Sequence, residues 1–116
     1  MNLRAARSLL DEPFRPRIVG YLNDYKLQVA KTTGEFLWPA HPETDELFLV
    51  VAGELTIQLR EREIVLGPGE MYVVPRGVEH CPRSEGGAEI LLIEPAGTVN
   101  TGDAPVGALT AEERML

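Results

Sequence analysis

The chain has 116 residues, the length of one domain with its own hydrophobic core, and leaves no room for a second. Eighteen Asp and Glu outnumber eleven Lys and Arg, and the resulting net charge of −7 disfavours nucleic acid and anionic membrane surfaces as partners. Cys81 is the single cysteine, which excludes an intramolecular disulfide and an all-cysteine metal site, and the lack of a membrane-length apolar run or a signal-peptide core predicts a cytoplasmic protein.

The first predicted element is a short helix over Asn2–Leu10, with Asn2 as its cap. From Ile18 to Glu94, short apolar or alternating runs are separated by turn residues, which is the pattern of β-strands. In chain order the predicted strands are Val19–Leu22, Tyr25–Lys31, Glu35–Trp38, Glu46–Val51, Leu55–Leu59, Glu63–Leu66, Met71–Val74, Val78–Arg83 and Ala88–Glu94. Because no stretch among them carries a helical period, the chain is predicted to be all-β, with antiparallel strands in a sandwich, jelly roll or barrel.

Two strands carry more specific expectations. Apolar residues in Tyr25–Lys31 alternate with Lys26 and Gln28, which predicts a strand with one buried face. Glu46–Val51 is apolar after its first residue, which predicts a strand covered on both faces. Turns are predicted at Asn23–Asp24 and Thr32–Gly34, and Ser84–Gly87 is predicted to lead from one strand into the last one.

The C-terminal part of the chain differs in composition. Pro95–Gly107 is rich in Gly, Pro, Thr and Asn, which is typical of an ordered arm or a mobile tail, and Thr110–Glu113 fits a capping box that predicts a helical last turn. The predicted organisation is therefore an N-terminal segment at 1–17, a barrel at 18–95 and a C-terminal arm at 96–116.

The residues able to carry chemistry are few. The two histidines, His41 and His80, both lie where a turn meets a strand. Glu46 opens an apolar strand and shares a face with Phe48 and Val50, so an inward orientation would place its carboxylate at the mouth of an apolar interior. A buried carboxylate is costly unless it is paired or bound to a metal.

The stretch Gly34–Arg83 resembles the two motifs of the cupin superfamily. His41, Glu46 and Gly53 stand at the spacing of the first motif, and the second motif is matched in full by Gly69, Pro75, Gly77 and His80. With Glu94–Thr98 and Asn100–Asp103 included, the resemblance extends over most of the chain. In this wider run the chain looks like the small single-domain cupins of unassigned activity, of the mannose-6-phosphate isomerase-like type.

This resemblance implies an antiparallel cupin β-barrel, or double-stranded β-helix, with short terminal helical segments. It also implies one divalent transition metal, Fe, Mn, Ni or Zn, with His41, Glu46 and His80 as ligands. The departure from the family pattern is Pro39, which stands where the family places a further histidine and has no donor atom. Two imidazoles and one carboxylate remain, the ligand set of the facial triad, and Glu43 is a conceivable substitute ligand.

Three functions follow as hypotheses. The first is a small cupin that binds a metal and a small organic ligand at it, with the reaction unassigned. The second is a metal-free binding or scaffold cupin, favoured by Pro39. The third, a metal-free epimerase-like cupin with a histidine base, would need a phosphate pocket built from Arg60, Arg62, Arg76 or Arg83, which the net charge disfavours.

Assembly and cysteine chemistry complete the expectations. The resemblance implies a homodimer, with the N-terminal segment and the Phe36/Trp38 face as candidate contacts. Cys81 follows His80 directly, so strand alternation sends it to the opposite face and disfavours a Cys/His catalytic pair.

Overall fold

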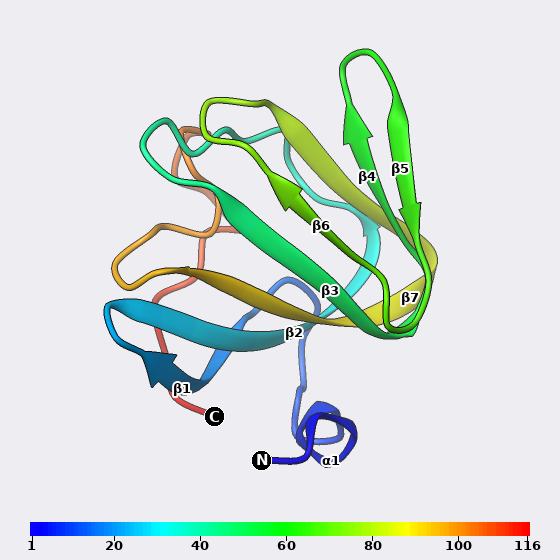
Figure 1. Ribbon diagram of the computed structural model, residues 1–116, viewed down its shortest axis with the longest axis vertical. Helices are drawn as coiled ribbons and strands as arrows, with labels where there is room; N and C mark the ends of the chain where they lie inside the picture. The colour runs from blue at the N-terminus through cyan, green and yellow to red at the C-terminus, as the bar shows by residue number, and fades with distance from the viewer.

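Seven strands and one short helix make up the computed structural model, which describes residues 1–116 except for the side chain of Arg7 (Figure 1). In chain order the elements are α1 (Leu3–Arg7), β1 (Arg17–Leu22), β2 (Tyr25–Glu35), β3 (Glu46–Gly53), β4 (Leu55–Leu59), β5 (Glu63–Leu66), β6 (Met71–Val74) and β7 (His80–Pro95). The predicted all-β fold is confirmed. In the described part of the chain, no helix is long and apolar enough to cross a membrane.

The long strand β7 organises the sheet. Its second half lies between β2 and β3, and its first half pairs with β4, so that the sheet curls round on itself (Figure 1). The strand order is β1-β2-β7-β3-β6, with β4 joined to β7 and β5, and every pairing is antiparallel. The curled sheet encloses one apolar core, formed by Ala30, Phe48, Val50, Leu55, Ile57, Leu66, Val74, Ala88, Ile90 and Leu92. This architecture is a jelly-roll barrel.

Two predicted breaks between strands, the turn at Thr32–Gly34 and the connection at Ser84–Gly87, are wrong, because the strand continues through each of them. Thr32–Gly34 lies inside β2, where the register with β7 shifts at a bulge and Gly34 takes a φ of +71°. Ser84–Gly87 likewise lies inside β7, where the same shift leaves extra residues unpaired. Glycine permits the bulge, while ladder bonds on both sides hold each strand extended, so what composition marks as a turn is a bend within a strand.

The alternation in β2 predicts a strand correctly, but its polar face is the one that looks into the barrel. Lys26 and Gln28 are buried in the interior, whereas Val29 packs on the outside against α1 in a second apolar cluster with Ala6 and Leu10. Because both faces of β2 are covered, apolar character does not mark the inner face here. Two polar side chains therefore line the barrel.

The two ends of the chain pack against the barrel. Asn2 caps α1 through bonds from Arg4 N and Ala5 N, as predicted, although the helix is shorter than expected. The helical turn predicted at Thr110–Glu113 is wrong, because the Thr110 hydroxyl bonds the Thr101 hydroxyl and Gly107 N instead. The C-terminal residues form an ordered arm, one of the two alternatives left by the sequence, which reaches β1 through a bridge between Met115 and Ile18.

Candidate metal centre

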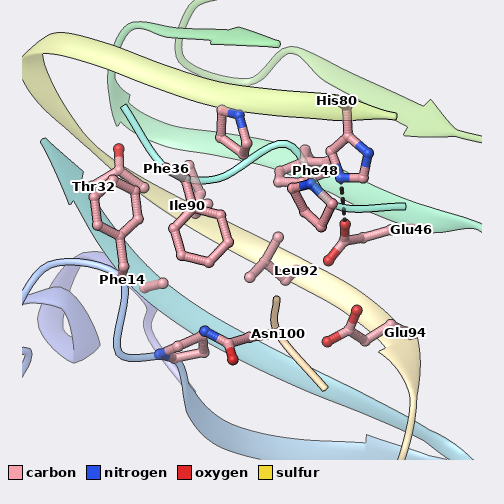
Figure 2. Close-up of a pocket in the computed structure, with 14 residues that line it drawn as sticks. Phe14, Thr32, Phe36, Glu46, Phe48, His80, Ile90, Leu92, Glu94 and Asn100 are labelled. Atoms are coloured by element: carbon pink, nitrogen blue, oxygen red, sulfur yellow. Dashed lines mark hydrogen bonds and ion pairs between the residues drawn. The ribbon is translucent and has the colours of Figure 1, made fainter. Parts of the chain in front are cut away.

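Three segments bring the candidate ligands to one end of the barrel. Glu46 is the first residue of β3 and His80 the first residue of β7, while His41 lies in the connection between β2 and β3. Phe48 and Val50 share the inward face with Glu46, as the alternation predicts. Figure 2 shows Glu46 and His80 directed toward each other across the interior.

The three side chains converge on a common point. His80 Nε2 lies 3.1 Å from Glu46 Oε1, and His41 Nε2 lies 3.2 Å from the same oxygen. One ligand atom from each residue falls within 4.8 Å of the others, and all three residues are buried. The structure therefore unites the residues that the sequence singled out.

Contacts behind His80 fix the orientation of its ring. Nδ1 lies 2.9 Å from the carbonyl oxygen of Val78, which can only accept, so Nδ1 carries a proton and donates it. The Phe48 ring packs edge-on against the imidazole, with 5.8 Å between centroids. This arrangement leaves Nε2 as the nitrogen that faces Glu46, and such a backbone partner on the distal nitrogen is typical of metal-ligating histidines.

His41 provides the test of whether a metal fits. Its Nε2 is buried and finds no hydrogen-bond partner among the described residues, although Glu46 Oε1 lies close by. A buried polar atom without a partner is costly, and this one is aimed at the point shared by Glu46 and His80. Two imidazole nitrogens and a carboxylate oxygen form a donor set that suits divalent transition metals, so the residues fit such an ion.

The charge of Glu46 is maintained inside the barrel. Burial by itself would raise the pKa of this carboxyl, but the imidazoles of His41 and His80 more than offset that effect and lower the pKa to about 2. At neutral pH Glu46 is therefore a carboxylate, the form that a metal requires.

A row of charged residues crosses the sheet beside this cluster. The register pairs Lys26 of β2 with Glu94 of β7 and Leu47 of β3 with Ile93, so that one residue further along Glu94 lies beside Glu46. Burial, together with the charge of Glu46, raises the pKa of Glu94 to about 10. Glu94 is therefore protonated at neutral pH, and its Oε2 finds no partner among the residues described.

The ammonium group of Lys26 lies closer to two other groups than it does to the carboxyl group of Glu94. Its Nζ donates to the carbonyl of Thr98 at 2.9 Å and lies 3.3 Å from Glu113 Oε2, against 3.7 Å from Glu94 Oε1. The lysine charge is therefore balanced first by Glu113 of the C-terminal arm, which agrees with a neutral Glu94.

Glu46, His80 and Glu94 line an interior cavity of about 40 Å³ (Figure 2). Its other walls are mostly apolar: Phe14, Pro16, Ala30, Phe36, Pro39, Phe48, Pro82, Ile90 and Leu92, with Thr32 and Asn100. At 10–15 Å³ for each molecule, this volume holds roughly three waters. A separate surface cleft of about 460 Å³ is lined by His41 together with Pro42–Thr44, Pro95–Val99 and Gly102.

Several other sequence candidates lie outside the cluster. Glu43 is exposed and is not part of it, so the idea of a substitute ligand is wrong for this conformation. Pro39 is buried in the cavity wall. Burial and the charge of Glu35 raise the pKa of the Cys81 thiol, whose sulfur contacts the Phe36 carbonyl, which is the environment of an inert structural cysteine.

The arginines proposed for a phosphate pocket also lie elsewhere. Arg60, Arg76 and Arg83 contact Glu79, Asp45 and Glu63 respectively, and none of the four arginines lines the interior cavity. Phe36 stacks on Phe14 of the N-terminal segment at 4.9 Å, and Trp38 lies under the Arg60 guanidinium. Phe36, which the sequence offered as part of a dimer contact, packs under the N-terminal segment in the structure.

Lys26 and Glu94 are the site residues that sequence reasoning missed. Glu94 is in phase with the buried Ile90 and Leu92, but Leu91 and Ile93 are apolar too, so the sequence of the last strand does not mark which face turns inward. Lys26 carried no signal either, because the polar face of its strand reads as the solvent face.

Together, the fold and the cluster define an antiparallel β-barrel with a candidate metal centre inside one end. Residues 26–94 match the Cupin domain family, so the chain belongs to the cupins. It is similar to the uncharacterized protein YdbB of Bacillus subtilis (strain 168), with 36% identity over 84 residues, which cover 72% of this chain and 74% of the relative.

Solved structures show the same likeness. A cupin-2 domain-containing protein from Shewanella frigidimarina NCIMB 400 superposes with a TM-score of 0.80 and 42% identity, over 82% of this chain and 93% of that one. Protein NMB1881 from Neisseria meningitidis gives a TM-score of 0.76 at 29% identity, over 83% and 98% of the two chains. The predicted cupin barrel is thereby confirmed.

Proposed function

We propose that the protein holds one divalent transition metal, Fe, Mn, Ni or Zn, through His41, Glu46 and His80, and binds a small organic ligand at that metal. The observation that carries this proposal is the buried Nε2 of His41, which lacks a hydrogen-bond partner among the described residues while pointing at the other two donors. A metal ion at this point would satisfy all three side chains at once.

Three protein ligands leave coordination positions for other molecules. A bound metal would supply Lewis acidity or, in the case of a redox metal, oxygen activation. The chain contributes an ionised carboxylate, two oriented imidazoles and an apolar wall that keeps water to a minimum. The reaction stays unassigned, because the same barrel supports many chemistries.

The two hollows beside the cluster differ in what they can hold. The interior cavity of about 40 Å³ suits only water-sized molecules. The surface cleft of about 460 Å³ is within the range of small-molecule pockets, and His41 lies in its wall. We therefore propose that the organic ligand approaches the metal from the cleft.

Metal uptake tests the proposal directly. Chelator-treated protein without an affinity tag is reloaded with Fe(II), Mn(II), Ni(II) or Zn(II), and metal content and affinity are measured by mass spectrometry and calorimetry. We expect about one ion per chain for the wild type, and a loss of at least about tenfold in affinity for His80→Ala and Glu46→Gln. Glu43→Gln, an exposed carboxylate of the same loop, is the matched control and should bind like the wild type.

The alternative is a metal-free binding module. Pro39, which supplies no donor atom in the place of a further ligand, favours it. A wild type that takes up none of the four metals would select this function, and the cleft beside His41 would then be the ligand site.

We further propose that the protein is a homodimer. Outward side chains of β3 and β7 form apolar rows that continue onto the edge strand β6, where Met71 and Val73 are 61% and 43% exposed. A second copy is the occupant that such a self-complementary apolar edge fits. Light scattering after size exclusion should give twice the chain mass, and a Met71→Lys/Val73→Lys variant should give the monomer. The relation to mannose-6-phosphate isomerase-like cupins stays a prediction.

A further inference from the structure

The segment that carries His41 is held along both of its edges. On one edge, Pro39 O accepts a hydrogen bond from His80 N at 3.1 Å, and His41 O accepts one from Gly77 N at 2.9 Å. Between these two residues, the backbone N–H and C=O of Ala40 point toward the opposite edge. The first edge thus ties His41 to His80, the other imidazole of the candidate metal centre.

The second edge is held by Asp103 of the C-terminal arm. Its Oδ1 accepts a bond from Ala40 N at 2.9 Å, and its backbone N–H donates to Ala40 O at 3.0 Å. One residue therefore satisfies both backbone groups of Ala40. Such a two-point contact fixes the position and direction of the chain immediately before His41.

Gly102 is the residue that lets the arm come so close. A Cβ at this position would clash with the backbone oxygen of Ala40 and press against Pro39 Cβ at 3.0 Å. Its φ of +55° also favours glycine. Any other residue would push the arm away from the segment that carries His41.

The residues just before Gly102 fasten the arm itself. The Asn100 side chain donates to Leu109 O at 2.9 Å and accepts from Ala111 N at 2.8 Å. Thr101 is fully buried, with its hydroxyl 3.1 Å from that of Thr110. Each residue of Asn100–Asp103 thus has a defined part, and together we call these four residues the clamp.

We propose that the clamp positions His41, with Asp103 and Gly102 as positioning residues that hold its imidazole at the point shared by Glu46 and His80. The inference rests on the proposed function as far as the metal is concerned. Its physical reason is that His41 lies in a connection outside the strands, so that its place depends on backbone contacts made there. A site with three protein ligands tolerates little misplacement of any one of them.

Metal affinity is the first readout. For the apo protein titrated with Co(II) or Zn(II), Asp103→Ala and Gly102→Ala should weaken binding by about 10–100-fold. Asp103→Asn should retain most of the affinity, because its amide oxygen can accept the same bond from Ala40 N. The d–d spectrum of the Co(II) form should change in Asp103→Ala and return in Asp103→Asn.

Glu70→Ala is the matched control. Glu70 Oε1 accepts a bond from Gly67 N at 2.7 Å, so the variant also removes a carboxylate-to-backbone bond, but in the turn between β5 and β6. It should lower thermal stability about as much as Asp103→Ala while leaving metal affinity and the Co(II) spectrum unchanged. Equal affinities for Asp103→Ala and the wild type would overturn the role of the clamp.

A second readout needs no metal and separates this inference from the proposed function. In the apo protein, Asp103→Ala should speed hydrogen exchange of the Ala40 and His41 amides and shift the side-chain resonances of His41, whereas Glu70→Ala should do neither. A wild type that binds no metal would refute the proposed function but would not test the clamp. Unchanged His41 resonances in Asp103→Ala would refute the role of the clamp, whether or not the protein binds a metal.

Discussion

Lys26 and Glu94 face each other across β2 and β7, with Nζ and Oε1 3.7 Å apart and both side chains almost wholly buried. The pair is nevertheless not a simple ion pair, because burial and the carboxylate of Glu46 on the other side of Glu94 both raise the pKa of Glu94 and disfavour a second negative charge. The interior thus keeps one carboxyl ionised and its neighbour protonated, an arrangement that has consequences for stability.

Glu94→Gln should remove a pH dependence from the metal-free protein. The pKa of Glu94 is about 10 when folded, against an ordinary value of 4.5, so between these values the folded chain holds a proton that the unfolded chain has lost. Stability must therefore fall as pH rises through this interval, by at most about 1.4 kcal/mol per pH unit. Glutamine cannot lose this proton. Urea unfolding at pH 5, 7 and 9 should show the wild type losing stability relative to Glu94→Gln, and parallel curves would refute the protonated state.

The fold could be predicted largely because strand signals are local. Alternation and turn residues located β3 to β6 closely, and the motif spacing identified the barrel. The predicted turn at Thr32–Gly34 and the predicted break between strands at Ser84–Gly87 were wrong because a bulge uses the same small residues as a turn, and only long-range pairing with neighbouring strands distinguishes the two.

The candidate site, like the fold, was predicted where the signal is local in the sequence and missed where it depends on long-range contacts. His41, Glu46 and His80 were found because they are scarce and stand at the family spacing. Lys26 was missed because its burial depends on β2 being covered on both faces, and the part played by Asp103 depends on a contact with Ala40, 63 residues away in sequence. Contacts between residues so far apart in the sequence exist only in the folded chain, so no local sequence pattern marks them.

Metal loading should depend on pH through the imidazoles and not through the carboxylate. Histidine must be neutral to ligate, so loading should fall as pH is lowered, because protons compete with the metal for the imidazole nitrogens. The pKa of Glu46, lowered to about 2, keeps the carboxylate ionised while the imidazoles gain protons. Metal content after equilibration between pH 4 and 8 measures this, and a metal content that does not change over this range would argue against imidazole ligation.

Pro39→His should strengthen metal binding. Pro39 lines the interior cavity, and its carbonyl oxygen accepts a hydrogen bond from His80 N. This bond fixes the backbone at position 39 beside the cluster, so a histidine side chain placed there would begin close to the other ligands. A fourth ligand should raise affinity at least about tenfold, equivalent to ~1.4 kcal/mol. Calorimetry with Zn(II) measures the change, and Pro39→Ala is the control that should leave affinity close to that of the wild type. An unchanged affinity in Pro39→His would show that the new ring does not reach the metal.

Gly53→Ala should be far more destabilising than Gly69→Ala, although both glycines have nearly the same positive φ, +81° and +82°. At Gly69 nothing lies within 4 Å of an added Cβ, so alanine costs only the left-handed conformation, roughly 1–2 kcal/mol. At Gly53 the new Cβ would meet Gly87 O at 2.3 Å and Ala88 Cα at 2.9 Å, backbone atoms of the bulged part of β7 that cannot move without disturbing its ladder. The free energy of unfolding of the two variants, measured with denaturant, separates the cost of the positive φ from the cost of the close backbone approach. Equal losses would mean that β3 and β7 can separate at this crossing, and that the long strand is less rigid than its pairing on both sides requires.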